Sequence, residues 1–273
     1  MVQGLQGRVV RLAVVLASGL LALSACGGTD VAGNVDPDQV DAVAAPQLGA
    51  CRNLIPQDLD QPTNATRTVD CKKKHTAQTY EVGEFPDELT DAGYDSDKLS
   101  AYAYQACSAR FQEFLGADES TVMRTIVSWV WFRPSEKAWD KGARWLRCDV
   151  VGGAAESKSL VTLPTTASGL LAHGATSDDW MVCVNGASVQ GAPKIPCSEK
   201  HNWRAVTTIK VGAPDDPYPG DDAVEKTTRD YCSQSVGAWL GYPKDYDFGY
   251  TWFHESEWKA GNRRSVCWAA TTA

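Results

Sequence analysis

Apolar residues recur with the period of an α-helix in two separate parts of the chain. The first stretch presents an apolar face that consists of Leu99, Ala103, Ala106 or Cys107, and Phe114. The second presents a similar face that consists of Val224, Thr228, Tyr231, Ser235 and Trp239. Residues that can cap a helix precede each stretch, namely Asp95, Ser96, Asp97, Asp221 and Asp222. Because a glycine, Gly116 or Gly241, follows each stretch, we predict one helix in each half of the chain.

Segments rich in β-branched and aromatic residues surround each predicted helix. In the first half they are residues 79–82, 125–132 and 145–151, and in the second half 205–209, 250–253 and 265–268. The last two segments of each half are predicted to form an antiparallel hairpin with a long connection. With an opening strand added, each half has the order β-β-α-β-β. We therefore predict an α+β fold, in which one helix packs on a small antiparallel sheet in each half.

Three motifs occur in the same order in both halves, which indicates an internal repeat. The first is Cys-x3-His, and the second is an aromatic residue followed by Leu-Gly after a helical cysteine. The third is Trp-x2-Gly-x-Arg-x3-Cys, formed by Trp139, Gly142, Arg144 and Cys148 and again by Trp258, Gly261, Arg263 and Cys267. We predict tandem domains over residues 48–153 and 179–273. The linker, residues 154–178, contains several leucines and is expected to pack in part.

The amino terminus has the pattern of a lipoprotein signal peptide. Arg8 and Arg11 precede an apolar run over residues 12–23, which is too short to span a membrane, and Cys26 follows small residues. We predict a signal peptide over residues 1–25, lipidation of Cys26, and a flexible tether over residues 26–47. An ordinary secretory signal with a coincidental cysteine is the alternative. Lipidation would attach the protein to the outer face of a bacterial plasma membrane.

Composition narrows the partners that the protein can bind. The formal net charge is −8, and the predicted signal peptide contains two arginines and no acidic residue. An acidic chain argues against nucleic acid or anionic lipid as a partner. The ten tryptophans either fill small cores or form contact surfaces, and composition does not separate these two roles.

Apart from Cys26, the chain has eight cysteines in two sets of four. Such sets in an exported chain predict disulfides, although four cysteines allow three pairings. We chose sequential pairing: Cys51–Cys71, Cys107–Cys148, Cys183–Cys197 and Cys232–Cys267. Zinc on Cys71 and His75 is an alternative, but Cys-x3-His fits the usual zinc spacings poorly. No Cys-x-x-C redox motif or unpaired candidate nucleophile is present, and we expect no metal and no cofactor.

Two pairs of motif residues have both a structural and a functional interpretation. His75 and His201 either bond to the backbone of the turn after their cysteine or contact a ligand and sense pH. Trp139 and Trp258 either stack with Arg144 and Arg263 around a glycine turn, or project from the surface to bind a sugar or a partner.

The sequence contains few of the features that are typical of hydrolase active sites. The chain has no Gly-x-Ser-x-Gly, His-Glu-x-x-His or glycine-rich phosphate loop. Glu136, Glu255 and Glu257 are close in sequence to tryptophans, as glycosidase carboxylates often are. We therefore expect no enzymatic activity, and we keep a wall hydrolase as a weaker alternative.

The lipobox, Cys-x3-His, helical cysteine and Trp-x2-Gly-x-Arg-x3-Cys together resemble the actinobacterial septum formation family. The resemblance covers residues 48–153 and 179–273, although Lys74 and Lys200 occupy positions where members commonly have proline. It implies a membrane-attached or secreted protein with a part in cell division. Our first hypothesis is a non-enzymatic envelope lipoprotein that contacts an envelope or division protein in septum formation or wall assembly. The alternative is a peptidoglycan- or glycan-binding module that uses surface tryptophans.

Overall fold

The computed structural model describes residues 34–89, 91, 93–172 and 177–271. These residues belong to one compact unit that begins at Asn34. The predicted signal peptide and Cys26 lie outside the described residues. The two predicted domains are referred to below as the first repeat (residues 48–153) and the second repeat (residues 179–271).

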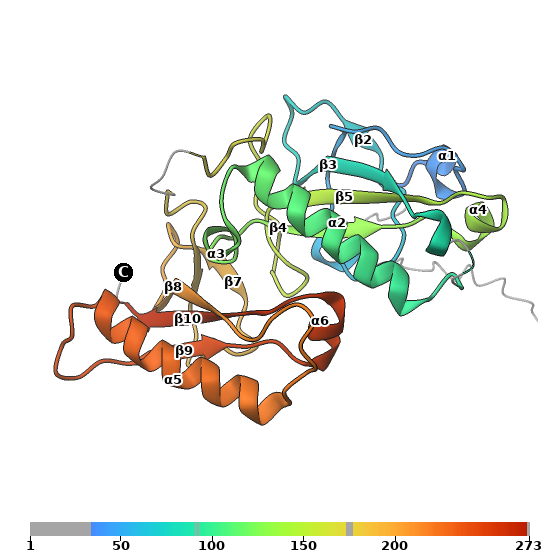
Figure 1. The fold of residues 1–273 in the computed structure, drawn as a ribbon. Coiled ribbons are helices and arrows are strands. Elements are labelled where there is room, and N and C mark those ends of the chain that lie inside the picture. The colour runs from blue at the N-terminus through green and yellow to red at the C-terminus, as the bar shows by residue number, and fades with distance from the viewer. Residues whose placement is uncertain (1–33, 90, 92, 173–176, 272–273) are drawn as a thin grey trace, which may run out of the picture. The chain divides into compact units, whose positions relative to one another are not determined.

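The first repeat contains a five-stranded antiparallel sheet in the order β2-β1-β3-β5-β4. The strands are β1 (Cys51–Arg52), β2 (Thr68–Val69), β3 (Ala77–Glu84), β4 (Ser128–Phe132) and β5 (Trp145–Val151). Helix α2 (Asp97–Leu115) packs across the sheet, as Figure 1 shows. The predicted hairpin is present as the antiparallel pair β4–β5.

The second repeat has the same architecture, with strand order β7-β6-β8-β10-β9. Its strands are β6 (Val182–Val184), β7 (Lys194–Pro196), β8 (Trp203–Lys210), β9 (Phe248–Thr251) and β10 (Arg264–Ala270). Helix α5 (Asp221–Trp239) packs on this sheet (Figure 1). The predicted α+β class, with two tandem domains that each contain two internal disulfides, is thus confirmed. Each sheet has one strand more than predicted. The extra strands, β2 and β7, contain only two and three residues and carry no readable alternation.

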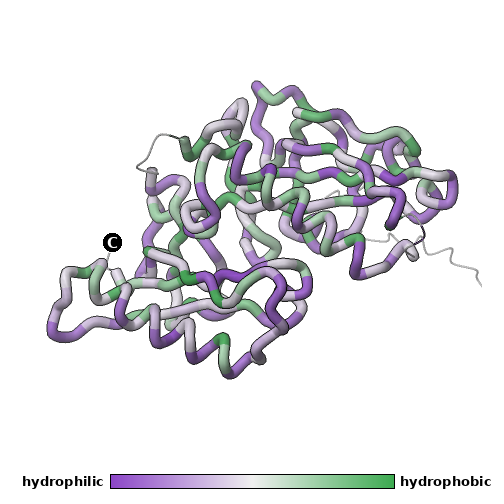
Figure 2. The backbone as a smooth tube through the Cα atoms, in the orientation of Figure 1, coloured by the Kyte–Doolittle hydropathy of each residue, from purple (hydrophilic) through white to green (hydrophobic). Residues whose placement is uncertain are grey.

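Six short helical segments complete the fold. They are α1 (Pro37–Val40), η1 (Pro56–Asp58), η2 (Asp87–Leu89), α3 (Glu119–Val122), α4 (Glu136–Asp140) and α6 (Glu255–Ala260). Within the described residues, no helix combines the length and apolar character needed to cross a membrane. Figure 2 shows why, because hydrophobic and hydrophilic residues alternate closely along both repeats.

Helix α2 forms where its apolar spacing predicts. Its buried face repeats every four residues and consists of Leu99, Ala103, Cys107, Phe111 and Leu115. The Ser96 hydroxyl accepts a hydrogen bond from the Lys98 backbone N–H at the start of the helix. Gly116 ends the helix with a φ of 74°, a conformation that glycine adopts without steric cost.

Helix α5 differs from its prediction in two respects. Its N-cap is Gly220, so Asp221 and Asp222 are not caps but lie in the first turn. There their charges interact favourably with the positive end of the helix dipole. The buried face consists of Val224, Thr228, Cys232, Val236 and Gly237. Tyr231 and Trp239, which we expected on that face, are exposed.

The predicted flexible tether is wrong for residues 34–47, which fold onto the first repeat. The Asp36 N–H donates to the Ala65 carbonyl at 2.8 Å, and Val35 forms a β-bridge with Thr66. The Ser135 hydroxyl donates to the Asp41 carboxylate at 2.7 Å. Small and polar composition suggested a free linker, but these backbone and side-chain bonds hold the segment in place. The linker after the first repeat is packed in part, since Leu163, Ala167 and Leu171 are buried.

Candidate functional site

Four disulfides link the eight cysteines in sequential pairs: Cys51–Cys71, Cys107–Cys148, Cys183–Cys197 and Cys232–Cys267. This is the predicted pairing. In each repeat one bond joins the first strand to the Cys-x3-His turn, and the other joins the helix to the last strand. The two repeats therefore have equivalent covalent frameworks, which allows their residues to be compared one to one.

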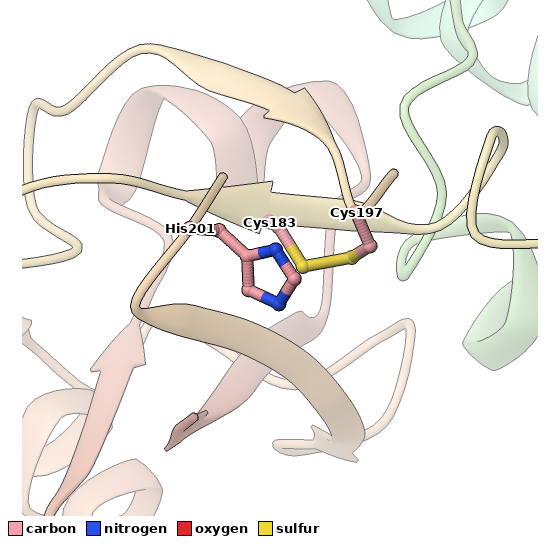
Figure 3. Close-up of side chains that lie close together, drawn as sticks. All are labelled: Cys183, Cys197 and His201. Carbon is pink, nitrogen blue, oxygen red and sulfur yellow. A yellow bond between two sulfur atoms is a disulfide. The ribbon is translucent and has the colours of Figure 1, made fainter. Parts of the chain in front are cut away.

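Each Cys-x3-His turn holds its imidazole ring with a backbone hydrogen bond. His75 Nδ1 donates to the Lys73 carbonyl at 2.9 Å, and His201 Nδ1 donates to the Glu199 carbonyl at 2.8 Å. Both rings are buried. Figure 3 shows the His201 ring next to the Cys183–Cys197 disulfide. These contacts favour the structural interpretation of the two histidines.

The one group of potential metal ligands found among the described residues combines the Cys-x3-His turn of the second repeat with Cys183 on β6. Donor atoms of Cys183, Cys197 and His201 lie within 4.8 Å of one another. Both sulfur atoms belong to a disulfide, whereas zinc binds the thiolate form of cysteine. The equivalent Cys71, beside His75, is also in a disulfide, so the zinc alternative has no thiolate in either repeat.

In each Trp-x2-Gly-x-Arg motif the arginine stacks on the tryptophan of the same motif, and we call this arrangement a clasp. The Arg144 guanidinium lies 4.0 Å from the centre of the Trp139 ring, and the Arg263 guanidinium lies 3.5 Å from that of Trp258. Both arginines also donate to the backbone carbonyl of their tryptophan. Gly142 and Gly261, with φ values of 95° and 115°, form the turns between them.

These clasps contradict the glycan-binding role suggested for Trp139 and Trp258, because the two side chains are buried, at 7% and 5% exposure. The carboxylates considered for a hydrolase have other contacts. Glu257 accepts from the His254 N–H at 2.9 Å, and Glu255 pairs with Lys259 at 3.1 Å. Glu136 lies in the first turn of α4, where an acidic residue stabilises the helix.

A buried ionic cluster in the first repeat was not predicted. Arg147 and Asp149 on β5 form an ion pair at 3.1 Å and are 1% and 0% exposed. Arg52 donates to the Thr79 hydroxyl at 2.8 Å, and that hydroxyl donates to Asp149 at 2.7 Å. Burial, together with the neighbouring Arg147 charge, lowers the pKa of Arg52 to about 10, so it remains protonated at neutral pH. The cluster therefore places two positive charges beside one negative charge.

The second repeat lacks this cluster. Counted from the last cysteine of each repeat, Arg147 and Asp149 correspond to Val266 and Trp268, which pack in an apolar cluster. A pocket of about 300 Å³ lies next to Arg52 and Arg147 and is bordered by Ala42 and residues 44–47 of the folded amino-terminal segment. In the sequence, the only sign of the ionic cluster was that two charged residues, Arg147 and Asp149, alternate with other residues in a predicted strand. The same pattern is typical of a strand with one solvent-exposed face.

The end of the main helix also differs between the repeats. In the first repeat, Phe114 is half-buried and the linker passes beside it. In the second repeat, the equivalent Trp239 is 50% exposed, and Tyr242, three residues later, is 76% exposed. A hollow of about 410 Å³ lies beside Trp239 and extends to His201 and Arg204. This aromatic patch, defined as Trp239 and Tyr242, is the best candidate for a contact site.

The model of the septum formation family matches residues 20–133 and, in an overlapping match, residues 49–267. No curated protein and no solved structure shows significant similarity to the chain. The longer match covers both repeats with their shared Cys-x3-His turns and Trp-x2-Gly-x-Arg clasps. The chain therefore belongs to the septum formation family.

Proposed function

We propose that this protein is a non-enzymatic component of the cell envelope that acts by contact with another protein in septum formation or cell-wall assembly. The family match carries this proposal, because the septum formation family is not a known enzyme family. The four disulfides support an oxidising, extracytoplasmic location.

Lipidation of Cys26 would hold the protein at the membrane. The support is the sequence pattern of Arg8, Arg11 and the apolar run before Cys26. Residues 34–47 are folded, so only residues 26–33 remain between the lipid and the fold. At roughly 3.5 Å per residue, this short connection reaches at most about 30 Å. The first repeat would therefore work close to the membrane surface.

The aromatic patch of the second repeat supports a contact role. Tyrosine and tryptophan that expose large apolar surfaces are typical of protein interfaces. Tyr242 is also the one residue other than glycine with a positive φ among those described, at 57°. A tyrosine in this conformation is strained, and strained residues concentrate at functional sites.

Replacing Tyr242 with glycine should increase the free energy of unfolding by about 0.5–1 kcal/mol. Glycine removes about 1–2 kcal/mol of left-handed strain and gives back part of it as extra entropy of the unfolded chain. Urea unfolding of the purified protein measures the change. Tyr242→Ala is the matched control, because it removes the ring but keeps the strain. If both variants lose stability equally, the ring serves the fold rather than a partner.

Imaging of the tagged protein in dividing cells tests the proposed function. We expect enrichment at the septum, and we expect Cys26→Ala to lose membrane attachment and that enrichment. The wild-type and variant proteins should be compared at equal expression, after confirming that both are exported. An even distribution of the wild-type protein around the envelope would contradict the septum role, and unchanged membrane attachment of Cys26→Ala would contradict lipid anchoring.

A further inference from the structure

In the first repeat, a segment of the chain itself fills the groove between the Cys-x3-His turn and the end of α2. We call residues 163–171 the cover segment and this site the first groove. Backbone N–H groups of the cover segment donate four hydrogen bonds to it: Leu163 to the His75 carbonyl (2.9 Å), Ala167 to Gln78 Oε1 (2.9 Å), Gly169 to the Phe114 carbonyl (2.7 Å) and Leu171 to the Leu115 carbonyl (2.9 Å). Leu163 and Leu171 are buried in the core of the repeat. The groove thus binds an extended segment through its backbone and its leucines.

In the second repeat, none of the described residues covers the equivalent groove. Counted from the matched cysteines, His75, Gln78, Phe114 and Leu115 correspond to His201, Arg204, Trp239 and Leu240. The hollow of about 410 Å³ is lined by His201, Arg204 and Trp239, and we call it the second groove. Within the described part of the chain, no hydrogen bond reaches the backbone carbonyls of His201, Trp239 or Leu240. These are the positions whose counterparts accept three bonds from the cover segment.

The aromatic side chains at the end of the main helix are more exposed in the second repeat than in the first. Phe114 packs against Tyr80, with ring centres 5.5 Å apart, under the cover segment. Trp239 at the equivalent position is half exposed, and Tyr242 stands where the first repeat has the small Ala117. The exposed Trp239 ring, which lines the groove, provides apolar surface for a segment supplied by another molecule.

The charges of the second groove indicate what that segment must carry. Gln78 accepts a hydrogen bond from the cover segment, whereas Arg204 at the same position can only donate. Arg124 also lines the groove, and it donates to the Val206 carbonyl at 3.3 Å. Asp178, paired with Arg204 at 2.7 Å, is the one carboxylate among the lining residues. Two guanidinium groups against one carboxylate favour an acidic side chain opposite Arg204.

We propose that the second groove binds a short extended segment of a partner protein, with leucines at its two ends and an aspartate or glutamate between them. The segment would occupy the place that residues 163–171 occupy in the first repeat. Its backbone N–H groups would bond to the carbonyls of His201, Trp239 and Leu240, and its carboxylate would face Arg204 and Arg124. This inference rests on the proposed contact function and specifies its partner.

Two labelled peptides test the proposal by fluorescence anisotropy with the purified full-length mature protein. One has the sequence of residues 163–172, Leu-Pro-Thr-Thr-Ala-Ser-Gly-Leu-Leu-Ala, and the other carries Ala167→Asp. We expect the aspartate peptide to bind with a Kd on the order of 10–100 µM and about tenfold more tightly than the unmodified peptide, as one charge-assisted hydrogen bond provides. Replacing the leucines of the aspartate peptide with serine should abolish binding.

Protein variants locate the binding site. Trp239→Ala should weaken binding of the aspartate peptide at least about tenfold, as loss of an interface aromatic does. Tyr231→Ala, which removes an exposed aromatic ring of the same helix, is the matched control and should bind normally. Arg204→Gln recreates the residue of the first repeat and should remove the preference for aspartate. Intact disulfides and an unchanged circular dichroism spectrum establish that each variant is folded.

Three results would overturn the proposal. They are absence of saturable binding, binding that Trp239→Ala leaves unchanged, and tighter binding of the unmodified peptide, which would assign the groove to the cover segment of a second copy. These results are independent of where the protein lies in the cell. Septal enrichment without peptide binding would support the proposed function and contradict the proposed role of the second groove. Peptide binding without septal enrichment would support the role of the groove and contradict the septum function.

Discussion

Replacing Asp149 with asparagine should lower the free energy of unfolding by about 3–5 kcal/mol, because it leaves buried positive charge without compensation. Asp149 is the carboxylate that faces both Arg147 and, through the Thr79 hydroxyl, Arg52. Asparagine keeps nearly the same shape, so the loss reports the charge rather than a cavity. Urea unfolding, with the m-value checked for constancy, measures the change.

Two control variants separate this explanation from a general sensitivity of the protein. Asp178→Asn removes a carboxylate from an exposed pair with Arg204 and should cost less than about 1 kcal/mol. Arg52→Met leaves the Arg147–Asp149 pair electrically balanced, so it should cost less than Asp149→Asn. In the double variant, Arg52→Met should recover part of the stability lost in Asp149→Asn. A cost below 1 kcal/mol for Asp149→Asn alone would show that the cluster is not held by charge compensation.

Removing the disulfide between α2 and β5 with the double substitution Cys107→Ser/Cys148→Ser should cost about 4 kcal/mol. The bond closes a loop with a sequence separation of 41 residues, and it restricts the unfolded chain accordingly. Both cysteines are fully buried in the core of the first repeat, so the serine hydroxyls add a desolvation cost. Chemical unfolding under non-reducing conditions measures the loss.

The matched control is Cys51→Ser/Cys71→Ser, which opens a loop with a sequence separation of 20 residues. Halving the loop length lowers the entropic contribution by only about 0.6 kcal/mol, so this variant should be destabilised slightly less. Cys71 is also more exposed than Cys148, which reduces the desolvation cost of serine. If the Cys107–Cys148 variant were as stable as wild type, the helix would be held by packing alone.

The covalent framework and the main elements were predictable because their signals are local. A helix face repeats every three to four residues, as at Leu99, Ala103 and Cys107, and a glycine such as Gly116 marks its end. Because the motifs are duplicated, each helix or strand predicted in one repeat was also expected at the equivalent position of the other. The even distribution of cysteines between two equivalent units predicted two disulfides in each, and the structure contains the sequential pairing chosen from the three that four cysteines allow.

The features that were missed depend on contacts between distant residues. The Arg52 and Asp149 side chains meet only after β1, β3 and β5 pair, and no local pattern distinguishes them from a solvent-exposed face. Residues 34–47 have the composition of a linker, but backbone bonds to residues 65–67 hold them in place. Tyr231 and Trp239 fit the helical period but lie beside the buried face and not on it, an offset that periodicity alone does not resolve.

The two repeats share a scaffold but differ at the sites that bear on the proposed function. Both have the same sheet order, disulfides and clasps, so their differences are not required by the scaffold. The first repeat buries an ionic cluster and covers its groove with its own linker. The second has an apolar interior at the equivalent positions, and among the described residues none covers its groove beside Trp239. The proposed contact is therefore assigned to the second repeat.

Photocrosslinking from position 242 in dividing cells tests this account most directly. A photoreactive residue at Tyr242 should form an adduct with one envelope or division protein, and mass spectrometry should map it to a segment with leucines around an acidic residue. The same photoreactive residue at Tyr231, an exposed position within α5, is the matched control and should give little of this adduct. Adducts of equal yield at both positions, or adducts with wall glycan and no protein, would contradict the account.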